Sequence, residues 1–344
     1  MTKTLISPNL LKKLLPLRAQ SFLQSSRKQA QQILMGKDHR LLIVTGPCSI
    51  HAIESALEYA HRLKRLQERV KESCFLVMRV YGEKPRTTVG WKGLLYDPQL
   101  DGTHDIAKGL HHMRALLLAL SEIGVPTATE FVDPLAAAYI DDLITWGFIG
   151  ARTSESQPHR QLASSLEMPI GFKNATDGSL EGAVNGVLSA KHPHSFLYID
   201  QEGKVASCRS AGNPHAHIVL RGSSDKPNYD SFSVYNAVSK LLKLQLTPRI
   251  LIDCAHGNCR KDHEKQKEVF ESVIKRLCSG DPHLMGVMLE SHIEAGNQSL
   301  SSSPNTRVSV TDPCIDWELT ESLISWADDS LLTGPSGRSS TLSG

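Results

Sequence analysis

The 344-residue sequence predicts an α/β fold, a closed (β/α)₈ TIM barrel, because two kinds of segment alternate along it. From Arg40 onward, short apolar runs rich in β-branched residues alternate with longer amphipathic stretches, which is typical of a parallel sheet. Eight such runs within about 250 residues fit a closed barrel. The alternative is an open doubly wound sheet, but no GxGxxG motif follows the first run.

The predicted strands are the short apolar runs. In chain order they cover 41–49, 74–81, 126–132, 148–152, 170–174, 217–221, 249–256 and 285–292. Between them, apolar residues recur at helical spacing, as in 52–71, 105–123, 134–145 and 263–277. Each run and the helix after it make one unit of the barrel.

Three segments depart from this repeat. A β-hairpin is predicted before the sixth strand, because residues 195–199 and 205–210 flank a short polar turn sequence. A Ser/Pro/Asn-rich loop at 299–307 follows the eighth strand, and a low-complexity, flexible tail covers 333–344.

The N-terminal segment has a charge balance of its own. Residues 1–40 hold eight Lys and Arg and one acid, Asp38, whereas the remainder carries 30 basic and 35 acidic residues. Leucines at 10, 11, 14 and 15 follow helical spacing, so we expect a helical extension that packs on the barrel or on a neighbouring subunit. A basic, acid-poor N-terminus is also compatible with a transit peptide. The expected division is an extension with oligomer or regulatory contacts (1–39), a catalytic barrel (40–332) and the tail.

The composition excludes several classes of protein. With 40% hydrophobic and 22% charged residues, the chain is neither disordered nor a coiled coil. No apolar run approaches the ~18 residues of a membrane helix, and no secretory signal pattern is present. A net charge of +2 is too balanced for a dedicated nucleic-acid surface. Seven cysteines without a CxxC motif argue against a disulfide framework and indicate a reducing cytoplasm.

Each predicted strand ends on or near a residue that can ligate a metal, bind an anion or transfer a proton. In a barrel, the active site lies where the strands end and the following loops begin. These residues are Cys48, Arg79, Glu130, Arg152, Lys173, Arg221, His256 and Glu290. One such side chain alone would more often be solvated or satisfied in the core, but eight converging positions point to an active site.

Cations form the first group at these positions. They are Arg79, Arg152, Lys173 and Arg221, joined by Lys84, Arg86 and Lys92 from the segment after the second strand. Converging cations repel one another unless anions neutralise them, and Arg and Lys suit phosphate and carboxylate groups. The sequence therefore predicts a phosphorylated ligand that also carries a carboxylate, with a second phosphate near residues 84–88. Nucleic acid is disfavoured, since no aromatic residues are interleaved with these cations.

Potential metal ligands form the second group. Cys48, His256 and Glu290, with Asp312 as a possible fourth, suit a borderline divalent ion (Mn, Fe, Co or Zn) better than Mg. From spacing alone, an ordinary buried Cys and a hydrogen-bonded His are an equally good interpretation. A rival cluster of Cys254, Cys259 and His263 stays open, because parity along a strand puts Cys254 and His256 on one face.

Seven long motifs, in the right order, resemble the class I 3-deoxy-D-arabino-heptulosonate 7-phosphate (DAHP) synthases, in the branch of the bacterial aromatic-feedback isoenzymes. They are GPCSIH at 46–51, RVYGEKPRTTVGWKG at 79–93, GARTSESQPHR at 150–160, GFKNATDGS at 171–179, IDCAHGN at 252–258, ESHIEAGNQSL at 290–300 and TDPCIDWE at 311–318. The resemblance extends from about Leu10 to Trp326.

The resemblance implies a role for each site residue. The family's metal ligands match Cys48, His256, Glu290 and Asp312. The residues that bind phosphoenolpyruvate match Arg79, Lys84, Arg152, Lys173 and Arg221, and those that bind erythrose 4-phosphate match Arg86 and Thr87. The catalytic residues match Lys84, Glu130 and His256.

The resemblance also implies a reaction and its setting. The family's transferases condense phosphoenolpyruvate, erythrose 4-phosphate and water to DAHP and inorganic phosphate, the first step of the shikimate pathway to the aromatic amino acids. We therefore expect one divalent metal ion per subunit, a homodimer or homotetramer, inhibition by an aromatic amino acid and a cytoplasmic location, with no nucleic-acid or membrane partner.

Departures and alternatives accompany this prediction. Ala52 stands where this branch usually has Asp, and Ala255 where it usually has Ser, and neither position is an expected ligand. One alternative is 3-deoxy-octulosonate 8-phosphate synthase, which uses arabinose 5-phosphate, although the KPRT segment and the extension favour the four-carbon sugar. The others are a catalytically silent regulatory barrel and a metal-storage protein. A storage role would leave the cations unexplained.

Overall fold

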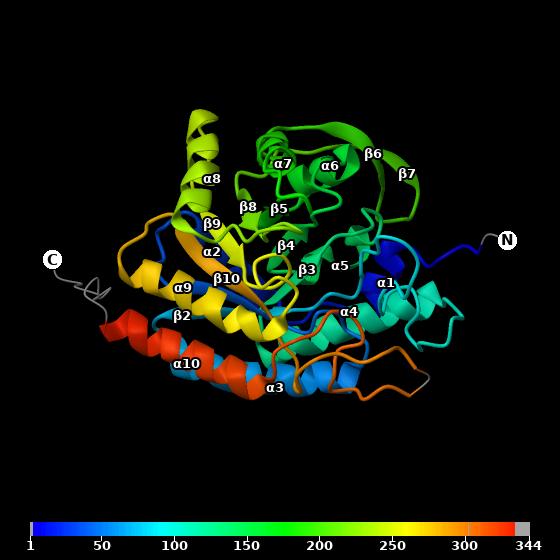
Figure 1. Ribbon diagram of the computed structural model, residues 1–344. Coiled ribbons are helices and arrows are strands. Elements are labelled where there is room, and N and C mark those ends of the chain that lie inside the picture. The colour runs from blue at the N-terminus through cyan, green and yellow to red at the C-terminus, as the bar shows by residue number, and fades with distance from the viewer. Residues whose placement is uncertain (1–2, 302, 334–344) are drawn as a thin grey trace.

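The computed structural model describes residues 3–301 and 303–333, which form a closed barrel of parallel strands (Figure 1). Around the barrel the strands are β1 (Leu41–Gly46), β10 (Leu284–Glu290), β9 (Ile250–Asp253), β8 (Ala216–Leu220), β5 (Ile170–Lys173), β4 (Trp146–Ile149), β3 (Thr127–Glu130) and β2 (Cys74–Arg79). β1 pairs with both β2 and β10, so that Val44 lies opposite Val77 on one side and Met288 on the other. The predicted fold class is confirmed.

Helices lie around the outside of the barrel (Figure 1). They are α3 (Ile53–Val70), α4 (Ile106–Ile123), α5 (Ala137–Ile140), α6 (Gln157–Ser165), α7 (Glu181–Lys191), α8 (Ser231–Lys243), α9 (Gln266–Cys278) and α10 (Trp317–Thr333), with 3₁₀ turns η1 (Asp141–Leu143) and η2 (His263–Lys265). The helix predicted at 134–145 is shorter than expected, because the Asp133 side chain accepts the Leu135 N–H in a turn that precedes α5. In the described residues, no helix is long and apolar enough to cross a membrane.

The N-terminal extension and the hairpin lie against each other and against the barrel. The hairpin consists of β6 (Ser195–Ile199) and β7 (Val205–Arg209), inserted before β8 as predicted. Helix α1 (Pro8–Leu14) packs against α5, and its Asn9 N–H donates to the Gln201 carbonyl of the hairpin turn at 2.8 Å. The extension thus packs on the chain's own barrel. The predicted tail lies outside the described residues, apart from Thr333, which ends α10.

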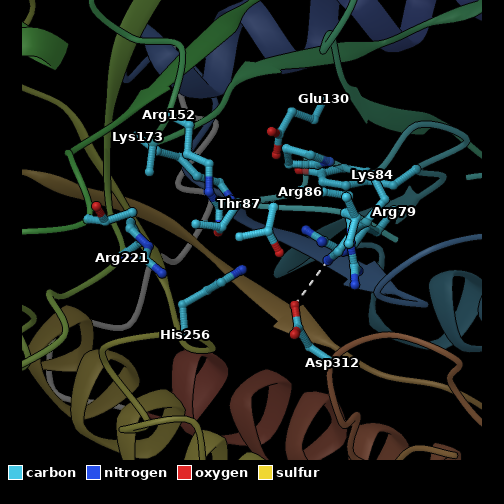
Figure 2. A pocket seen from close by; sticks show the side chains of 16 residues that line it. Arg79, Lys84, Arg86, Thr87, Glu130, Arg152, Lys173, Arg221, His256 and Asp312 are labelled. Atoms are coloured by element: carbon cyan, nitrogen blue, oxygen red, sulfur yellow. Dashed lines mark hydrogen bonds and ion pairs between the residues drawn. The ribbon is translucent and has the colours of Figure 1, made fainter. Parts of the chain in front are cut away.

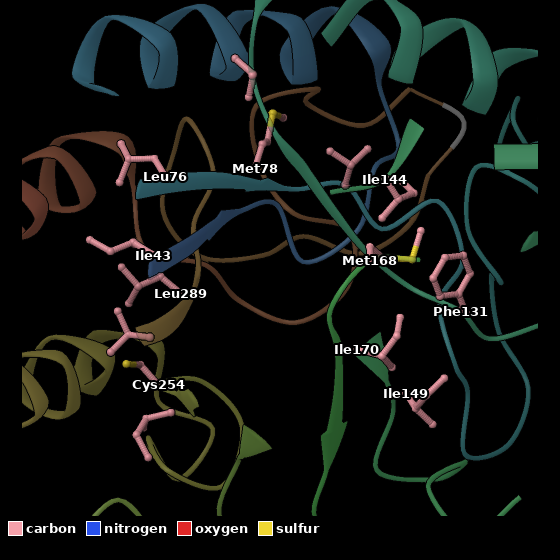
Figure 3. Packing of buried hydrophobic residues seen from close by; sticks show 14 of the residues in the cluster. Ile43, Leu76, Met78, Phe131, Ile144, Ile149, Met168, Ile170, Cys254 and Leu289 are labelled. Atoms are coloured by element: carbon pink, nitrogen blue, oxygen red, sulfur yellow. The ribbon is translucent and has the colours of Figure 1, made fainter. Parts of the chain in front are cut away.

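Alternate strand residues enter two hydrophobic layers. Ile43, Leu76 and Met78 belong to the outer layer, between strands and helices (Figure 3). Leu42, Val44, Val77 and other residues of the same strands fill the barrel interior, where helix α2 (Gln20–Leu34) adds Ala30, Ile33 and Leu34. Helix α2 meets the first residues of the strands. It therefore closes the end of the barrel opposite the carboxyl ends of the strands. Each buried aliphatic side chain stabilises the fold by about 1.5–3 kcal/mol.

Three strands end three residues earlier than the sequence indicates. β1 ends at Gly46, β4 at Ile149 and β9 at Asp253, against predicted ends at 49, 152 and 256. Gly46 has a φ of +150°, and a Cβ there would lie 2.8 Å from the Arg79 carbonyl oxygen. His256 has a φ of +56°, in the left-handed region, which ends the extended backbone. Cys48, Arg152 and His256 therefore lie in loops rather than in strands, and so does Arg221, one residue after the end of β8.

Candidate active site

A cavity of about 260 Å³ opens at the carboxyl ends of the strands (Figure 2). All residues predicted to bind substrate line it, namely Arg79, Lys84, Arg86, Thr87, Arg152, Lys173 and Arg221. Glu130, His256 and Asp312 line it as well. Figure 2 shows Arg152, Lys173 and Arg221 on the opposite side of the cavity from Arg79 and Lys84. Residues from distant parts of the sequence thus face one enclosed space.

Arg79, the last residue of β2, is fixed by contacts on all sides of its guanidinium group. It donates to the carbonyl oxygens of Pro47 and Cys48 at 3.2 and 3.3 Å and to Glu290 Oε1 at 2.8 Å. Its guanidinium carbon also lies 3.6 Å from the centre of the Tyr81 ring. Burial alone would lower the Arg79 pKa, but Tyr81, Glu290 and Cys48 outweigh burial and raise it. Arg79 is a permanent, rigidly held positive charge.

Asp253, the last residue of β9, bridges two of the predicted site residues. Its Oδ2 accepts a hydrogen bond from Lys173 Nζ at 3.0 Å and lies 3.0 Å from His256 Nδ1. Asp253 is completely buried, which by itself would raise the carboxyl pKa. Electrostatic interactions with His256 and Lys173 outweigh burial, so the Asp253 pKa lies well below its ordinary value. This carboxylate hydrogen-bonds the ammonium group and lies within ion-pair distance of the imidazole.

Three of the four predicted metal ligands meet in one cluster. Donor atoms of Cys48, Glu290 and Asp312 all lie within 4.8 Å of one another. His256 is not part of this group, but its Nε2 lies 3.7 Å from Glu290 Oε1. A thiol, an imidazole and two carboxylates suit a borderline divalent ion, so the donor chemistry fits a metal of that class.

Lys84 contacts the donor cluster directly. Its Nζ donates to Cys48 Sγ at 2.7 Å and to Asp312 Oδ2 at 3.0 Å (Figure 2). Burial alone would lower the Lys84 pKa, yet the surrounding thiol and carboxylates outweigh burial and raise it. The same ammonium group lowers the pKa of Asp312 well below its ordinary value. Burial raises the pKa of the Cys48 thiol to about 12, and Glu290 adds to that effect. A bound cation would therefore be needed to hold Cys48 as a thiolate at neutral pH.

The rival cysteine cluster is not assembled. Cys254 belongs to the outer hydrophobic layer, where Figure 3 shows it near Leu289 rather than at the cavity. Within the described residues, Cys254, Cys259 and His263 do not belong to any group of three or more converging potential metal ligands. Cys254 continues the outward alternation of Ile252, whereas the chain has left the strand after Asp253 and reaches His256 in a left-handed conformation, so the two residues do not share one face as predicted.

The remaining predicted residues differ in how firmly they are held. Glu130 ends β3 and is buried, and it packs so closely on Gly150 that a Cβ there would lie 2.1 Å from Glu130 Oε1. Arg86 and Thr87, by contrast, lie on an exposed segment of the loop between β2 and α4. Lys92, in the same loop, lies with its Nζ 5.8 Å from the centre of the Tyr96 ring and does not line the cavity.

Two residues at the site were absent from the prediction. Tyr81 lines the cavity, and its buried hydroxyl has no hydrogen-bond partner among the described residues. Asp253 holds Lys173 and His256. The available signal was the alternation along each strand. It puts Asp253 on the barrel interior, where an isolated carboxylate would need partners.

The fold and the cavity together define a class of protein: a (β/α)₈ barrel enzyme of the kind that binds phosphorylated, anionic substrates beside a divalent metal. Comparison with known families makes this specific. Residues 20–325 match the model of the DAHP synthetase I family, and the chain belongs to that family. The resemblance noted from the motifs is thereby confirmed.

Curated relatives cover almost the whole chain. The Tyr-sensitive phospho-2-dehydro-3-deoxyheptonate aldolase of Escherichia coli is 48% identical over 94% of this chain and 92% of its own length. The Trp-sensitive enzyme of the same species is 46% identical over 87% and 86%. Phospho-2-dehydro-3-deoxyheptonate aldolase from Francisella tularensis has a solved structure that matches with a TM-score of 0.94 at 42% identity, covering 96% of this chain and 97% of its own.

Proposed function

We propose that this protein is a DAHP synthase, which condenses phosphoenolpyruvate with erythrose 4-phosphate and water to give DAHP and inorganic phosphate. The observation that carries the proposal is the cavity, which six Lys and Arg side chains line beside the cluster of Cys48, Glu290 and Asp312. Relatives named as phospho-2-dehydro-3-deoxyheptonate aldolases, at up to 48% identity over most of the chain, support the same reaction.

Phosphoenolpyruvate fits the cationic end of the cavity. Its phosphate and carboxylate groups would be bound by Arg79, Lys84, Arg152, Lys173 and Arg221. The pKa of Arg221 is lowered by burial, the largest cause, and also by the neighbouring charge of Arg152. Erythrose 4-phosphate would bind through Arg86 and Thr87, at the exposed side of the same cavity. The cations hold two anions that would otherwise repel each other, which is an effect of orientation.

The donor set would hold one divalent metal ion per subunit, with Cys48, His256, Glu290 and Asp312 as ligands. Such an ion polarises the aldehyde of erythrose 4-phosphate when bound. Asp253 keeps the His256 imidazole oriented, and Lys84 neutralises the carboxylate of Asp312. The chain supplies no preference among Mn, Fe, Co and Zn.

The side chains divide the proton transfers between them. Lys84 Nζ carries the proton that the aldehyde oxygen takes up as the methylene carbon of phosphoenolpyruvate attacks the aldehyde carbon. Water then adds at the neighbouring carbon, which bears the phosphate ester, and Glu130, which lines the cavity, would accept a proton from that water. The resulting hemiketal phosphate collapses, and the C–O bond to the leaving phosphate breaks. The imidazole of His256 lines the same cavity, with its Nδ1 3.0 Å from Asp253 Oδ2, and is the third side chain with a catalytic role.

The relatives and the composition support a proposal for regulation, assembly and location. Because curated relatives are named Tyr-sensitive and Trp-sensitive, an aromatic amino acid is the expected inhibitor of this chain as well. A homodimer or homotetramer in the cytoplasm is the expected form, with an N-terminal extension (1–39), a catalytic barrel (40–332) and a short tail (333–344).

The test is a turnover assay on the metal-supplemented protein, with phosphate release as the readout. Erythrose 4-phosphate should support phosphate release, arabinose 5-phosphate should be used at least about a hundredfold less efficiently, and one aromatic amino acid should inhibit. A preference for the five-carbon sugar would establish the sister enzyme instead. No phosphate release with either aldehyde would establish a catalytically silent barrel.

A further inference from the structure

Glu83, immediately before Lys84, is a buried carboxyl group that the proposed reaction does not use. Only 3% of the residue is exposed. A carboxylate without water requires strong partners, yet in the described part of the chain no Lys or Arg nitrogen lies within ion-pair distance of Glu83. Its partners are instead two backbone N–H groups and a phenol. The N–H groups belong to the loop after β3, and the phenol belongs to the loop between β2 and α4.

The Glu83 side chain links two loops of the active site. Its Oε1 accepts the Asp133 N–H at 3.1 Å, and its Oε2 accepts the Val132 N–H at 3.4 Å. Both residues follow β3, two and three positions after Glu130. The Tyr96 hydroxyl lies 3.2 Å from Glu83 Oε1 and also 3.2 Å from Asp133 Oδ2. Glu83 therefore connects the loop of Lys84 with the loop of Glu130.

The segment from Lys84 to Lys92 is a flap, closed at its base beside Glu83. Lys84 N–H donates to the Lys92 carbonyl at 2.8 Å, and Leu95 N–H donates to the Gly82 carbonyl at 3.0 Å. Gly93 packs so tightly here that a Cβ would lie 2.3 Å from the Gly82 oxygen and 2.9 Å from Glu83 Cα. The exposed part of this flap carries Arg86 and Thr87. Any movement of Glu83 would consequently move the flap at its base.

The contacts of Glu83 also require an additional proton. The single Tyr96 hydroxyl proton cannot serve both Glu83 and Asp133, so one carboxyl must be protonated for all the contacts to be favourable. Burial, with Asp133 as the second cause, raises the Glu83 pKa to about 8. Two further groups face this cluster: the Lys92 ammonium, 5.8 Å from the Tyr96 ring centre, and His159, whose Nε2 lies 2.8 Å from the Val132 carbonyl. Neither contacts the Glu83 carboxyl directly.

We propose that Glu83 is a positioning residue: its neutral side chain fixes the flap to the loop after β3 and so sets where Arg86 and Thr87 meet erythrose 4-phosphate, whereas the Lys84 ammonium is held separately by Cys48 and Asp312. This role rests on the proposed function for its kinetic consequence, but not for its structural one. Ionisation of Glu83 puts a second negative charge beside Asp133 and loosens the flap. Binding of erythrose 4-phosphate should weaken as the pH rises above about 8, while binding of phosphoenolpyruvate should not.

The kinetic test compares wild type, Glu83→Gln and Glu83→Ala in the full, metal-supplemented chain. Gln keeps one acceptor oxygen, enough for the shorter hydrogen bond from the Asp133 N–H, and cannot ionise. Glu83→Gln should therefore keep a near-wild-type KM for erythrose 4-phosphate at pH 7 and lose its rise at alkaline pH. Glu83→Ala should raise that KM about tenfold or more, with KM for phosphoenolpyruvate within about twofold, since small displacements of positioning groups are costly. Equal rises in both KM values, or none, would overturn the proposal.

A second readout does not depend on turnover and so separates this proposal from the assigned reaction. Hydrogen exchange of residues 84–92 should be faster in Glu83→Ala than in wild type and unchanged in Glu83→Gln. Tyr96→Phe removes the shared hydroxyl but keeps the ring, and it should show an intermediate increase even if Glu83→Ala fails to fold. If exchange in the flap is the same in all variants, Glu83 does not hold it, whatever the enzyme's substrates are.

Discussion

The two halves of the cavity are built in different ways. At the proposed phosphoenolpyruvate half, Arg79 and Lys173 end strands, are almost fully buried and are tied to Glu290 and Asp253. At the proposed erythrose 4-phosphate half, Arg86 and Thr87 are exposed on a flap between β2 and α4. A charge that the barrel wall has already desolvated and oriented binds an anion more strongly than one that must be ordered on binding. The buried half should therefore dominate the energetics of the site.

The largest effect is expected at the donor cluster. Cys48→Ala and His256→Ala should each lower kcat by about 10³-fold or more, because several kcal/mol of stabilisation by the metal would be lost. Thermal unfolding should change little, since neither substitution opens a large cavity. The measurement is turnover after chelator treatment and reconstitution with metal. Near-wild-type rates in either variant would contradict the assignment of the ligands.

The next effect tests the buried cations. Lys173→Ala should lower kcat/KM for phosphoenolpyruvate by a factor that corresponds to about 2–4 kcal/mol of transition-state stabilisation. Arg152→Ala, at an exposed position, should lie at the lower end of that range. Lys173→Ala should also destabilise the protein by about 3–5 kcal/mol, because Asp253 loses its partner in the barrel interior. Denaturant unfolding of the two variants checks this difference. A loss confined to erythrose 4-phosphate would contradict the division of the cavity.

Asp253→Asn examines the connection between the cations and the donor cluster. The substitution preserves shape but removes the charge that faces Lys173 and His256, so metal affinity should fall about 10–100-fold. Titration calorimetry of metal-free samples measures this directly. The pKa of Asp253 is lowered far below its ordinary value. The ionised carboxylate therefore stabilises the folded protein in full at every pH above the ordinary carboxyl pKa. This stabilisation is lost only as the pH falls through the lowered pKa, so the difference from wild type should be constant between pH 5 and 9.

The smallest kinetic effect is expected for Arg86→Ala. Because this side chain is exposed, its loss should raise KM for erythrose 4-phosphate only about fivefold, and added salt should reduce the difference. Steady-state kinetics at two ionic strengths provide the test. If Arg86→Ala is as damaging as Lys173→Ala, exposure does not decide the strength of these contacts.

The pH dependence of stability should differ between wild type and Glu83→Gln. The Glu83 pKa is raised from 4.5 to about 8, so between these values the folded protein binds a proton that the unfolded chain does not. This contribution makes the protein less stable as the pH rises through that window, and Glu83→Gln should remove it. Denaturant unfolding at pH 5, 7 and 9 measures the effect. An identical pH profile for both proteins would show that Glu83 ionises normally.

Much of this molecule follows from the sequence alone. Alternating apolar runs and helical patterns determine a parallel sheet with both faces covered, and eight such runs without a GxGxxG motif favour a closed barrel over an open sheet. The same alternation places Arg79, Glu130, Lys173 and Glu290 at strand ends, where apolar runs stop at a chargeable residue. The motifs then indicate the family, since order and spacing along the chain are themselves specific.

Only the tertiary structure decided which of these groups act together. Cys48 and Asp312 are 264 residues apart, and their contact depends on barrel closure between β1 and β10. Asp253 and Glu83 look like ordinary acids in the sequence, because a carboxyl group's role depends on the solvent it loses and the partners it gains. Cys254 keeps the outward direction of Ile252, whereas the backbone turn after Asp253, with His256 in the left-handed region, brings the imidazole to the cavity. Local pattern determines the elements, whereas desolvation and long-range contact determine their chemistry.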